Sequence, residues 1–307
     1  MEAERRGPVN DVEQLLDGIP SLAGQERQVT LLPGGLTNRN YRVRTSTGLD
    51  VVVRHSSPQT GLLGVDRAAE HANSVAAADA GVGAPVIDYV PALNVLVVQF
   101  LPGRTYADDD VAGNLPRVAA ALRRLHAGPT FRGRFDMVQL QRSYLAICTE
   151  RGFDIPADYL QWAPYAARVA SAFAVSPEPL VPCHNDLLAA NFLDDGGEVA
   201  IIDYEYSGMN EPSFELGNLI AEAQLGRTAL TELCTAYYGH HDDALIARAE
   251  LWGVLARYGW TLWGMIQRAS SSIDFDFWEW SMVKYDAARA AFADPGFESL
   301  CARVANR

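Results

Sequence analysis

The stretch Cys183-His184-Asn185-Asp186-Leu187-Leu188-Ala189-Ala190-Asn191 decides the fold, together with the run Ile201-Ile202-Asp203 that follows it. It reads His-x-Asp, four residues, Asn, and then an Asp at the end of a second apolar run. Phosphoryl transfer needs these groups, because one carboxylate orients the attacking hydroxyl while an amide and a second carboxylate hold Mg²⁺. The spacing is therefore typical of a phosphoryl-transfer loop followed by a metal-binding Asp.

An Asp- and Asn-rich turn between two strands is the competing interpretation of the same residues. We assign Asp194-Asp195-Gly196-Gly197 to such a hairpin. The joint spacing of Asp186, Asn191 and Asp203 favours the catalytic interpretation. We expect His184 to be a buried histidine whose ring hydrogen-bonds the backbone near Asp203, rather than a proton-transfer group.

The composition limits the class of protein. The chain has 307 residues, 49% of them hydrophobic, which is enough for two lobes, and its net charge of −13 argues against a nucleic-acid surface and suits a cationic small substrate. The four cysteines lie far apart, the first residues have no secretory signal, and no segment is long and apolar enough to span a bilayer. We expect a cytoplasmic protein with no nucleic-acid partner and no membrane insertion, and the sequence leaves its oligomeric state open.

The predicted secondary structure changes from mainly strands to mainly helices near residue 101. Strands are predicted at 29–32, 41–44, 49–54, 86–89 and 95–100, with one helix at 66–80. Helices are predicted beyond that point, at 114–126, 158–174, 214–226, 229–238, 243–269 and 277–293. The predicted domains are therefore a β-rich lobe at 1–101, which would bind the nucleotide, and a helical lobe at 102–307, which would carry catalysis and substrate binding.

Two weaker motifs precede the loop. Pro33-Gly34-Gly35-Leu36-Thr37-Asn38 would let the backbone approach a phosphate, although Gly-Gly between strands is usually only a hairpin turn. Arg54 at the end of a strand and Glu70 in the next helix would form a cation and carboxylate pair that anchors phosphates. The alternative is that Arg54 is a surface arginine and Glu70 a solvated glutamate.

Five of the six tryptophans fall between positions 252 and 280. Trp252, Trp260 and Trp263 would project within an arc of roughly 80° on one helix, so a core stripe explains them without any function. The functional alternative is an aromatic cage, because indole faces bind a quaternary ammonium through cation–π contact.

The chain resembles the choline/ethanolamine kinase family, within the aminoglycoside-phosphotransferase-like kinases. The matching strings run in family order: Gly34 to Asn38; Val51 to Arg54; Glu70; Cys183 to Asn191; Ile202-Asp203-Tyr204-Glu205-Tyr206 with Asn210; Phe214-Glu215-Leu216-Gly217-Asn218; and Trp260-Thr261-Leu262-Trp263 followed by Ser272-Ile273-Asp274-Phe275.

The resemblance implies a protein-kinase-like α+β fold of two lobes and ATP-dependent, Mg²⁺-dependent phosphorylation of a small alcohol such as choline. It implies Asp186 as the catalytic base and Asn191, Asp203 and Glu205 at the metal. The nucleotide would be bound by Gly34, Gly35, Thr37, Asn38, Arg54, Glu70 and, at the adenine, Gln99, Phe100 and Leu101. The acceptor would meet Trp260, Trp263 and Trp280.

Three positions are departures: Arg54 stands where protein kinases use Lys, although Arg is common in this family, Glu215 stands where the family usually has Asp, and Trp280 where it often has Tyr. The alternatives to choline phosphorylation are a kinase of the same fold that acts on an aminoglycoside, a sugar or another metabolite, and a catalytically silent nucleotide-binding homologue.

Overall fold

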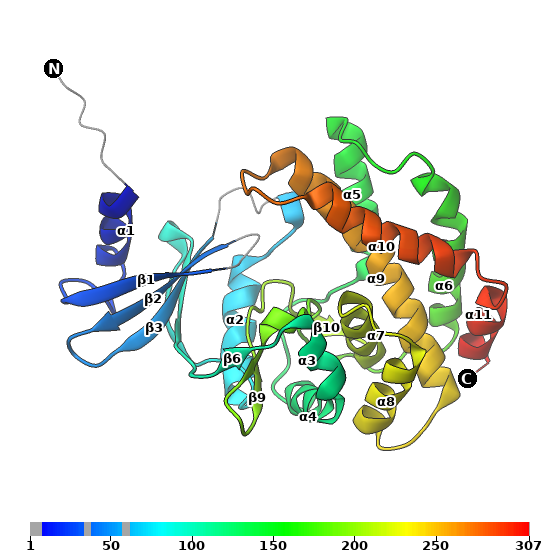
Figure 1. The fold of residues 1–307 in the computed structure, drawn as a ribbon, viewed down its shortest axis with the longest axis horizontal. Helices are drawn as coiled ribbons and strands as arrows, with labels where there is room; N and C mark the ends of the chain where they lie inside the picture. The colour runs from blue at the N-terminus through cyan, green and yellow to red at the C-terminus, as the bar shows by residue number, and fades with distance from the viewer. Residues whose placement is uncertain (1–7, 34–37, 57–61, 307) are drawn as a thin grey trace. The chain divides into compact units, whose positions relative to one another are not determined.

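The protein is described here from a computed structural model, which covers residues 8–33, 38–56 and 62–306 (Figure 1). The chain divides into two compact units, Met1–Thr60 with Ala84–Pro102 and Gly61–Gly83 with Gly103–Arg307. The first unit is a small antiparallel sheet and the second is mostly helical, as the sequence predicts. The segment 61–83, which the predicted boundary after residue 101 leaves with the sheet, makes its contacts within the helical unit.

The sheet of the first unit has the strand order β1-β2-β3-β5-β4. Its strands are antiparallel: β1 (Arg27–Leu32), β2 (Asn38–Thr45), β3 (Asp50–Ser56), β4 (Val86–Val90) and β5 (Val95–Gln99). Alternate residues face one side, so Tyr41 lies opposite Val53, which in turn lies opposite Val97, and all three are buried. Leu16 at the end of α1 (Pro8–Asp17) and Ile19 just after it belong to the same apolar cluster. The short 3₁₀ turn η2 (Pro91–Leu93) joins β4 to β5.

The second unit contains most of the helices and two small sheets. Its helices are α2 (Arg67–Asp79), α3 (Asp108–Gly113), α4 (Leu115–His126), α5 (Met137–Arg151), α6 (Ala163–Val175), α7 (Pro212–Glu222), α8 (Arg227–Tyr238), α9 (Asp243–Ser270), α10 (Phe277–Phe292) and α11 (Phe297–Ala305). Six of the seven predicted helices are present as single α-helices. The seventh, predicted at 158–174, begins as the 3₁₀ turn η3 (Tyr159–Trp162), and α6 starts beside Pro164, whose ring favours a first helical turn. Helices α1, α3, α5 and α11 were not predicted.

The long helix α9 is the centre of the helical unit, and α5, α7 and α10 pack against it (Figure 1). Its crossing with α7 is very close. A Cβ atom built on Gly217 would lie 1.9 Å from the Ala249 carbonyl oxygen, and one on Gly253 would lie 2.8 Å from the Gly217 carbonyl oxygen. Only glycine fits at this contact, which fixes α7 and its acidic side chains against the tryptophans of α9.

The small sheets carry the predicted catalytic loop. Strand β7 (Val181–Cys183) pairs with β10 (Gly208–Asn210), and β8 (Phe192–Asp194) lies between β6 (Arg104–Thr105) and β9 (Val199–Ile201). The predicted loop therefore runs from β7 through the 3₁₀ turn η4 (Ala189–Asn191) into β8. Among the described residues, no helix has both the length and the apolar composition that a membrane span requires.

Candidate active site

The loop after β7 turns sharply just before Asp186. Asn185 is completely buried and has a left-handed backbone with a φ of 69°, which Asn tolerates better than most residues. Its amide nitrogen donates to the Tyr206 carbonyl at 3.0 Å, and its amide oxygen accepts from the Asn210 side chain at 2.9 Å. These bonds fix the residue that precedes Asp186.

His184 supports the same turn from inside. One ring nitrogen, Nε2, lies 2.8 Å from the Ile202 carbonyl, and the other, Nδ1, accepts the Asp186 backbone N–H at 3.2 Å. Nε2 must then carry the proton and donate it. The ring is buried and hydrogen-bonded to the backbone next to Asp203, which confirms the prediction for this histidine.

The backbone brings Asp186, Asn191 and Asp203 together. The Asn191 side-chain amide donates to the Asp186 carbonyl at 2.8 Å, and the Ile202 N–H donates to the Asn191 carbonyl at 2.9 Å. Asp203 follows with a φ of 74°, a strained conformation for a residue other than glycine. Such strain is concentrated at functional sites, where the surrounding structure has to maintain it.

The electrostatic setting of Asp186 is strongly acidic. Burial is the largest cause that raises the pKa of its carboxyl group well above the usual value, followed by the carboxylates of Glu222, Glu205 and Asp203, while the Lys284 ammonium acts in the opposite direction. A concentration of negative charge of this kind attracts cations to the site.

Arg67 joins two of the predicted site residues. Its guanidinium donates to Glu70 at 2.6 Å and to Glu205 at 3.2 Å, and both carboxylate side chains are only 4% exposed. Glu70 is therefore held beside Glu205 within the helical unit. Its predicted pairing with Arg54, a residue of β3 in the sheet unit, stays a prediction.

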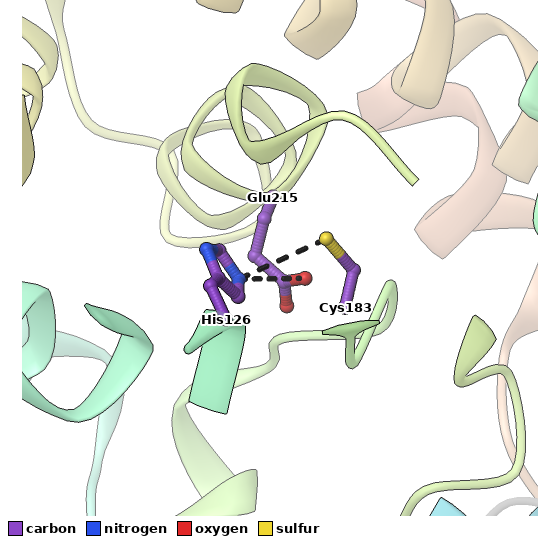
Figure 2. Close-up of side chains that lie close together, drawn as sticks. All are labelled: His126, Cys183 and Glu215. Carbon is purple, nitrogen blue, oxygen red and sulfur yellow. Dashed lines mark hydrogen bonds and ion pairs between the residues drawn. The ribbon is translucent and has the colours of Figure 1, made fainter. Parts of the chain in front are cut away.

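Glu215 lies behind the loop, as Figure 2 shows, with its carboxylate directed at His126 from α4 and Cys183 from β7. Its Oε2 is 3.6 Å from His126 Nε2, which is 3.7 Å from Cys183 Sγ. The other His126 nitrogen, Nδ1, lies 2.7 Å from the Tyr237 hydroxyl, and all three side chains of the cluster are buried. Burial, followed by the nearby Glu215 carboxylate, raises the pKa of the Cys183 thiol well above its usual value.

Glu215 also anchors the predicted catalytic loop itself. Its carboxylate accepts the His184 N–H at 2.8 Å and the Asn185 N–H at 3.3 Å. In the part of the chain that the structure describes, His126, Cys183 and Glu215 form the one group of His, Cys and acidic residues that meet closely enough for a metal ion. Because both Glu215 oxygens accept backbone N–H groups, we assign this cluster to the support of the loop. The glutamate, which stands where aspartate is usual, thus still hydrogen-bonds the loop although its side chain is longer by one methylene.

The three predicted cage tryptophans lie in different settings. Trp260 is 3% exposed and its indole N–H donates to Asn218 Oδ1 at 3.0 Å. Trp263 is 6% exposed and donates to the Tyr206 hydroxyl at 2.8 Å, and its ring centroid lies 5.2 Å from that of the half-buried Trp280. Trp263 and Trp280 are therefore neighbours, while Trp260 lies deeper and also packs edge-on against the Tyr206 ring. Trp252 donates to Glu211 and stacks on Phe173, as expected of a core residue.

The residues predicted to bind the nucleotide belong to the first unit, apart from Glu70. Gly34, Gly35 and Thr37 lie outside the described residues, and Asn38 is the buried first residue of β2. Arg54 is a buried residue of β3, and β5 ends at Gln99, whose N–H donates to the Pro85 carbonyl. The Phe100 ring lies under the Arg42 guanidinium at 3.5 Å, and half-buried Leu101 follows it. Their contact with a nucleotide stays a prediction.

Sequence reasoning missed Arg67, Glu222 and Lys284. Arg67 lies three residues before Glu70, a spacing that brings two side chains together on a helix, so a signal was present. Glu222 lies two helical turns after Glu215 in α7. Lys284 gave no local signal, because its partner Glu222 lies on another helix.

The sheet unit, the helical unit and the acidic loop define the class: a protein with the protein-kinase-like fold of the small-molecule phosphotransferases. Residues 28–252 match the phosphotransferase enzyme family (APH). A solved choline/ethanolamine kinase family protein from Mesorhizobium loti is 32% identical, with 97% of this chain and 99% of that one covered and a TM-score of 0.84. The chain belongs to this phosphotransferase family, in its choline/ethanolamine kinase branch.

More distant relatives agree with that assignment. Ethanolamine kinase 2 of Rattus norvegicus is 30% identical over 129 residues, which are 35% of this chain and 34% of the rat protein, so the match spans about a third of that relative. Choline kinase LicA from Streptococcus pneumoniae shares the fold with a TM-score of 0.79 at 22% identity, over 92% of this chain and 99% of LicA. A further LicA structure of similar fold contains AMP.

Proposed function

We propose that this protein is a kinase that transfers the γ-phosphoryl group of ATP, with Mg²⁺, to the hydroxyl group of choline or a related small amino alcohol. The observation that carries the proposal is the position of Asp186 among acidic side chains, next to a helix bundle that pairs the indoles of Trp263 and Trp280. A cationic acceptor suits both features, because carboxylates and indole faces attract cations.

The residues present fit a magnesium ion. The Asn191 amide nitrogen is engaged by the Asp186 carbonyl, which leaves the amide oxygen as the ligand end of that side chain. Together with the carboxylates of Asp203 and Glu205, this gives a set of hard oxygen donors, the kind that Mg²⁺ prefers. When bound, the ion would neutralise charge on the phosphates of ATP.

Asp186 has the role of orienting the acceptor hydroxyl and accepting its proton. The support behind it fits this role: Asn185, His184 and Glu215 hold the loop through backbone bonds, so the carboxylate is positioned before the substrate arrives. Arg54, Glu70, Asn38 and the segment Gln99 to Leu101 would bind ATP, as would the glycine turn at Gly34 and Gly35. We place the enzyme in the cytoplasm as part of this proposal, because ATP is its donor.

The test is ADP release from Mg-ATP with choline, ethanolamine, a sugar alcohol and an aminoglycoside as acceptors. The Asp186→Asn protein is the matched control, since it keeps the size of the side chain and removes its charge. Turnover with an amino alcohol that is lost in the control supports the proposal. Turnover only with the sugar alcohol or the aminoglycoside would replace it with another kinase of this fold, and nucleotide binding without turnover would replace it with a silent homologue.

A further inference from the structure

Lys284 is the only lysine in the chain. The sequence has 25 basic residues, and the other 24 are arginines. Lys284 lies in α10, one helical turn after Trp280, and it is only 9% exposed. A buried cation this close to the predicted acceptor site needs a partner, because an uncompensated charge there would be costly.

The ammonium group of Lys284 has two partners. It lies 2.5 Å from Oε2 of Glu222, at the end of α7, and 4.1 Å from the centre of the Trp280 ring. The face of an indole is the best neutral host for a cation. In this structure a face of Trp280 is therefore already taken by a cation that belongs to the protein.

The second carboxylate oxygen of Glu222, unlike the first, has no hydrogen-bond partner among the described residues. The Glu222 side chain is 5% exposed, and this oxygen, Oε1, is buried. The Nδ2 atom of Asn218, one helical turn earlier in α7, is also buried and has no hydrogen-bond partner in the part of the chain that the structure describes. Since the Glu222 carboxylate is among the groups that raise the pKa of Asp186, this unpaired acceptor lies within electrostatic reach of the base that would meet the substrate hydroxyl.

We propose that Lys284 determines the acceptor: it occupies a face of Trp280 and leaves the buried Glu222 Oε1 without a hydrogen-bond partner, so the site selects an amino alcohol with a primary ammonium over one with a quaternary ammonium. This inference rests on the proposed function and narrows it. A primary ammonium has three N–H donors and would supply the hydrogen bond that the buried oxygen lacks. A quaternary ammonium has none and depends on the ring face that Lys284 covers.

The choice of lysine over arginine matters for this role. Lysine carries a compact point charge, whereas a guanidinium is planar and stacks broadly on an indole. Arginine at position 284 would cover the ring at least as well, and methionine would leave an apolar chain of similar length with no charge. The two replacements therefore separate the charge of Lys284 from its packing.

The experiment compares kcat/KM for ethanolamine and for choline in the wild-type protein and in three variants. We expect the wild type to favour ethanolamine by about tenfold or more, because a site built to hydrogen-bond an N–H rejects an analogue that lacks it. Lys284→Met should reduce this ratio at least about fivefold, mainly through a lower KM for choline, and Lys284→Arg should keep it. Arg268→Met is the control, because Arg268 makes a similar contact with Trp278 at 4.7 Å but is exposed, and the ratio should stay within about twofold.

A wild-type preference for choline would overturn the inference while leaving the proposed function intact. So would a Lys284→Met protein whose ratio is unchanged, or one in which both KM values rise together, since that result would mean that the lysine only orients Glu222. Absence of turnover with both amino alcohols would instead contradict the proposed function.

A second measurement does not depend on the folding of any variant. Lysine labelled with ¹³C at Cε gives a single side-chain resonance, because the chain has one lysine. Its protons should be shifted upfield by the Trp280 ring in the free protein and should stay shifted when ethanolamine is added to saturation, whereas choline should move them toward the value of an exposed lysine. An unshifted resonance in the free protein, or equal displacement by both compounds, would overturn the inference.

Discussion

The loop from Cys183 to Asn191 has two sides that differ in their electrostatics and in their hydrogen bonds. On one side Asp186 lies among Glu222, Glu205 and Asp203, its pKa is raised, and Glu222 Oε1 is buried with no hydrogen-bond partner among the described residues. On the other side Glu215 is fully buried and engages two loop N–H groups together with His126. The first side keeps an excess of carboxylates around Asp186 even though Glu222 pairs with Lys284 and Glu205 with Arg67, and the second side is hydrogen-bonded to the loop backbone.

The residues that hold the loop in place are therefore distinct from the residues that are proposed to react with substrate. The hydrogen bonds from Glu215 keep the loop backbone in one conformation while Asp186 and its acidic neighbours bind and release substrate. Such a loop is preorganised for the reaction. Substitutions on the Asp186 side of the loop should therefore change activity without changing stability. Substitutions on the Glu215 side should change both.

The largest effect is expected on the acidic side of the loop, from Asp186→Ala. Removing the carboxylate takes away the group that orients and deprotonates the acceptor hydroxyl, so kcat should fall by roughly 10² to 10⁴. The free energy of unfolding should not fall, since the raised pKa of Asp186 indicates that its charge is unfavourably placed in the folded protein. Steady-state kinetics and urea unfolding check both parts. Activity within a few-fold of the wild type would end the assignment.

Behind the loop, Glu215→Ala should affect stability and rate together. The N–H groups of His184 and Asn185 would lose their buried acceptor, which should lower the free energy of unfolding by about 3 kcal/mol. Displacement of the loop should lower kcat by about 10²-fold. Glu215→Asp, which keeps the charge and is shorter by one methylene, should fall between the two proteins. A Glu215→Ala protein with wild-type stability would contradict the distinction between the two sides.

A smaller effect is expected at the acceptor pocket. Trp263→Ala should raise KM for the amino alcohol, choline included, by about tenfold and leave KM for ATP close to the wild-type value, because Trp263 is predicted to contact the acceptor and not the nucleotide. Initial-rate kinetics with each substrate varied in turn measure both constants. If the protein unfolds, or if both constants shift together, Trp263 is a core residue and the aromatic cage is wrong.

The smallest effect concerns the thiols, which include Cys183 behind the loop. Burial raises the pKa of Cys148 to about 11 and that of Cys234 to about 12, and it also raises the pKa of Cys183 and Cys301. A raised pKa keeps a thiol protonated and unreactive below that pKa, so at pH 8 only about 10⁻³ of Cys148 would be thiolate. We expect no reaction with a thiol reagent in the native protein at pH 8 and reaction of four thiols in denaturant. Rapid native labelling of Cys183 would show that the rear of the loop is open.

The sequence predicted the elements whose signal is local. The spacing from Asp186 to Asn191, the strands of the sheet and the long helix α9 each depend on neighbouring residues, and each is present. Helix α5 was missed although Met137, Leu140 and Tyr144 share one face, because Val138 and Leu145 lie on another face and blur the apolar stripe. The short α3 has only six residues and too little periodicity to detect.

The contact between Glu222 and Lys284, which we propose to determine the acceptor, could not be predicted in this way. Glu222 and Lys284 are 62 positions apart and meet only because α7 and α10 both pack on α9. The close approach of α7 to α9 depends in turn on Gly217 and Gly253, whose role appears only when the two helices are seen together. Local patterns thus predicted the catalytic loop, and tertiary packing supplied the neighbours of the acceptor.

The most direct test is a single reaction with Mg-ATP and equal concentrations of ethanolamine and choline, followed by ³¹P NMR. We expect a phosphomonoester signal, with phosphoethanolamine as the main product, and no such signal with Asp186→Asn. A reaction that forms no phosphomonoester while the protein still binds ATP would contradict the proposal that this protein phosphorylates an amino alcohol at its acidic loop.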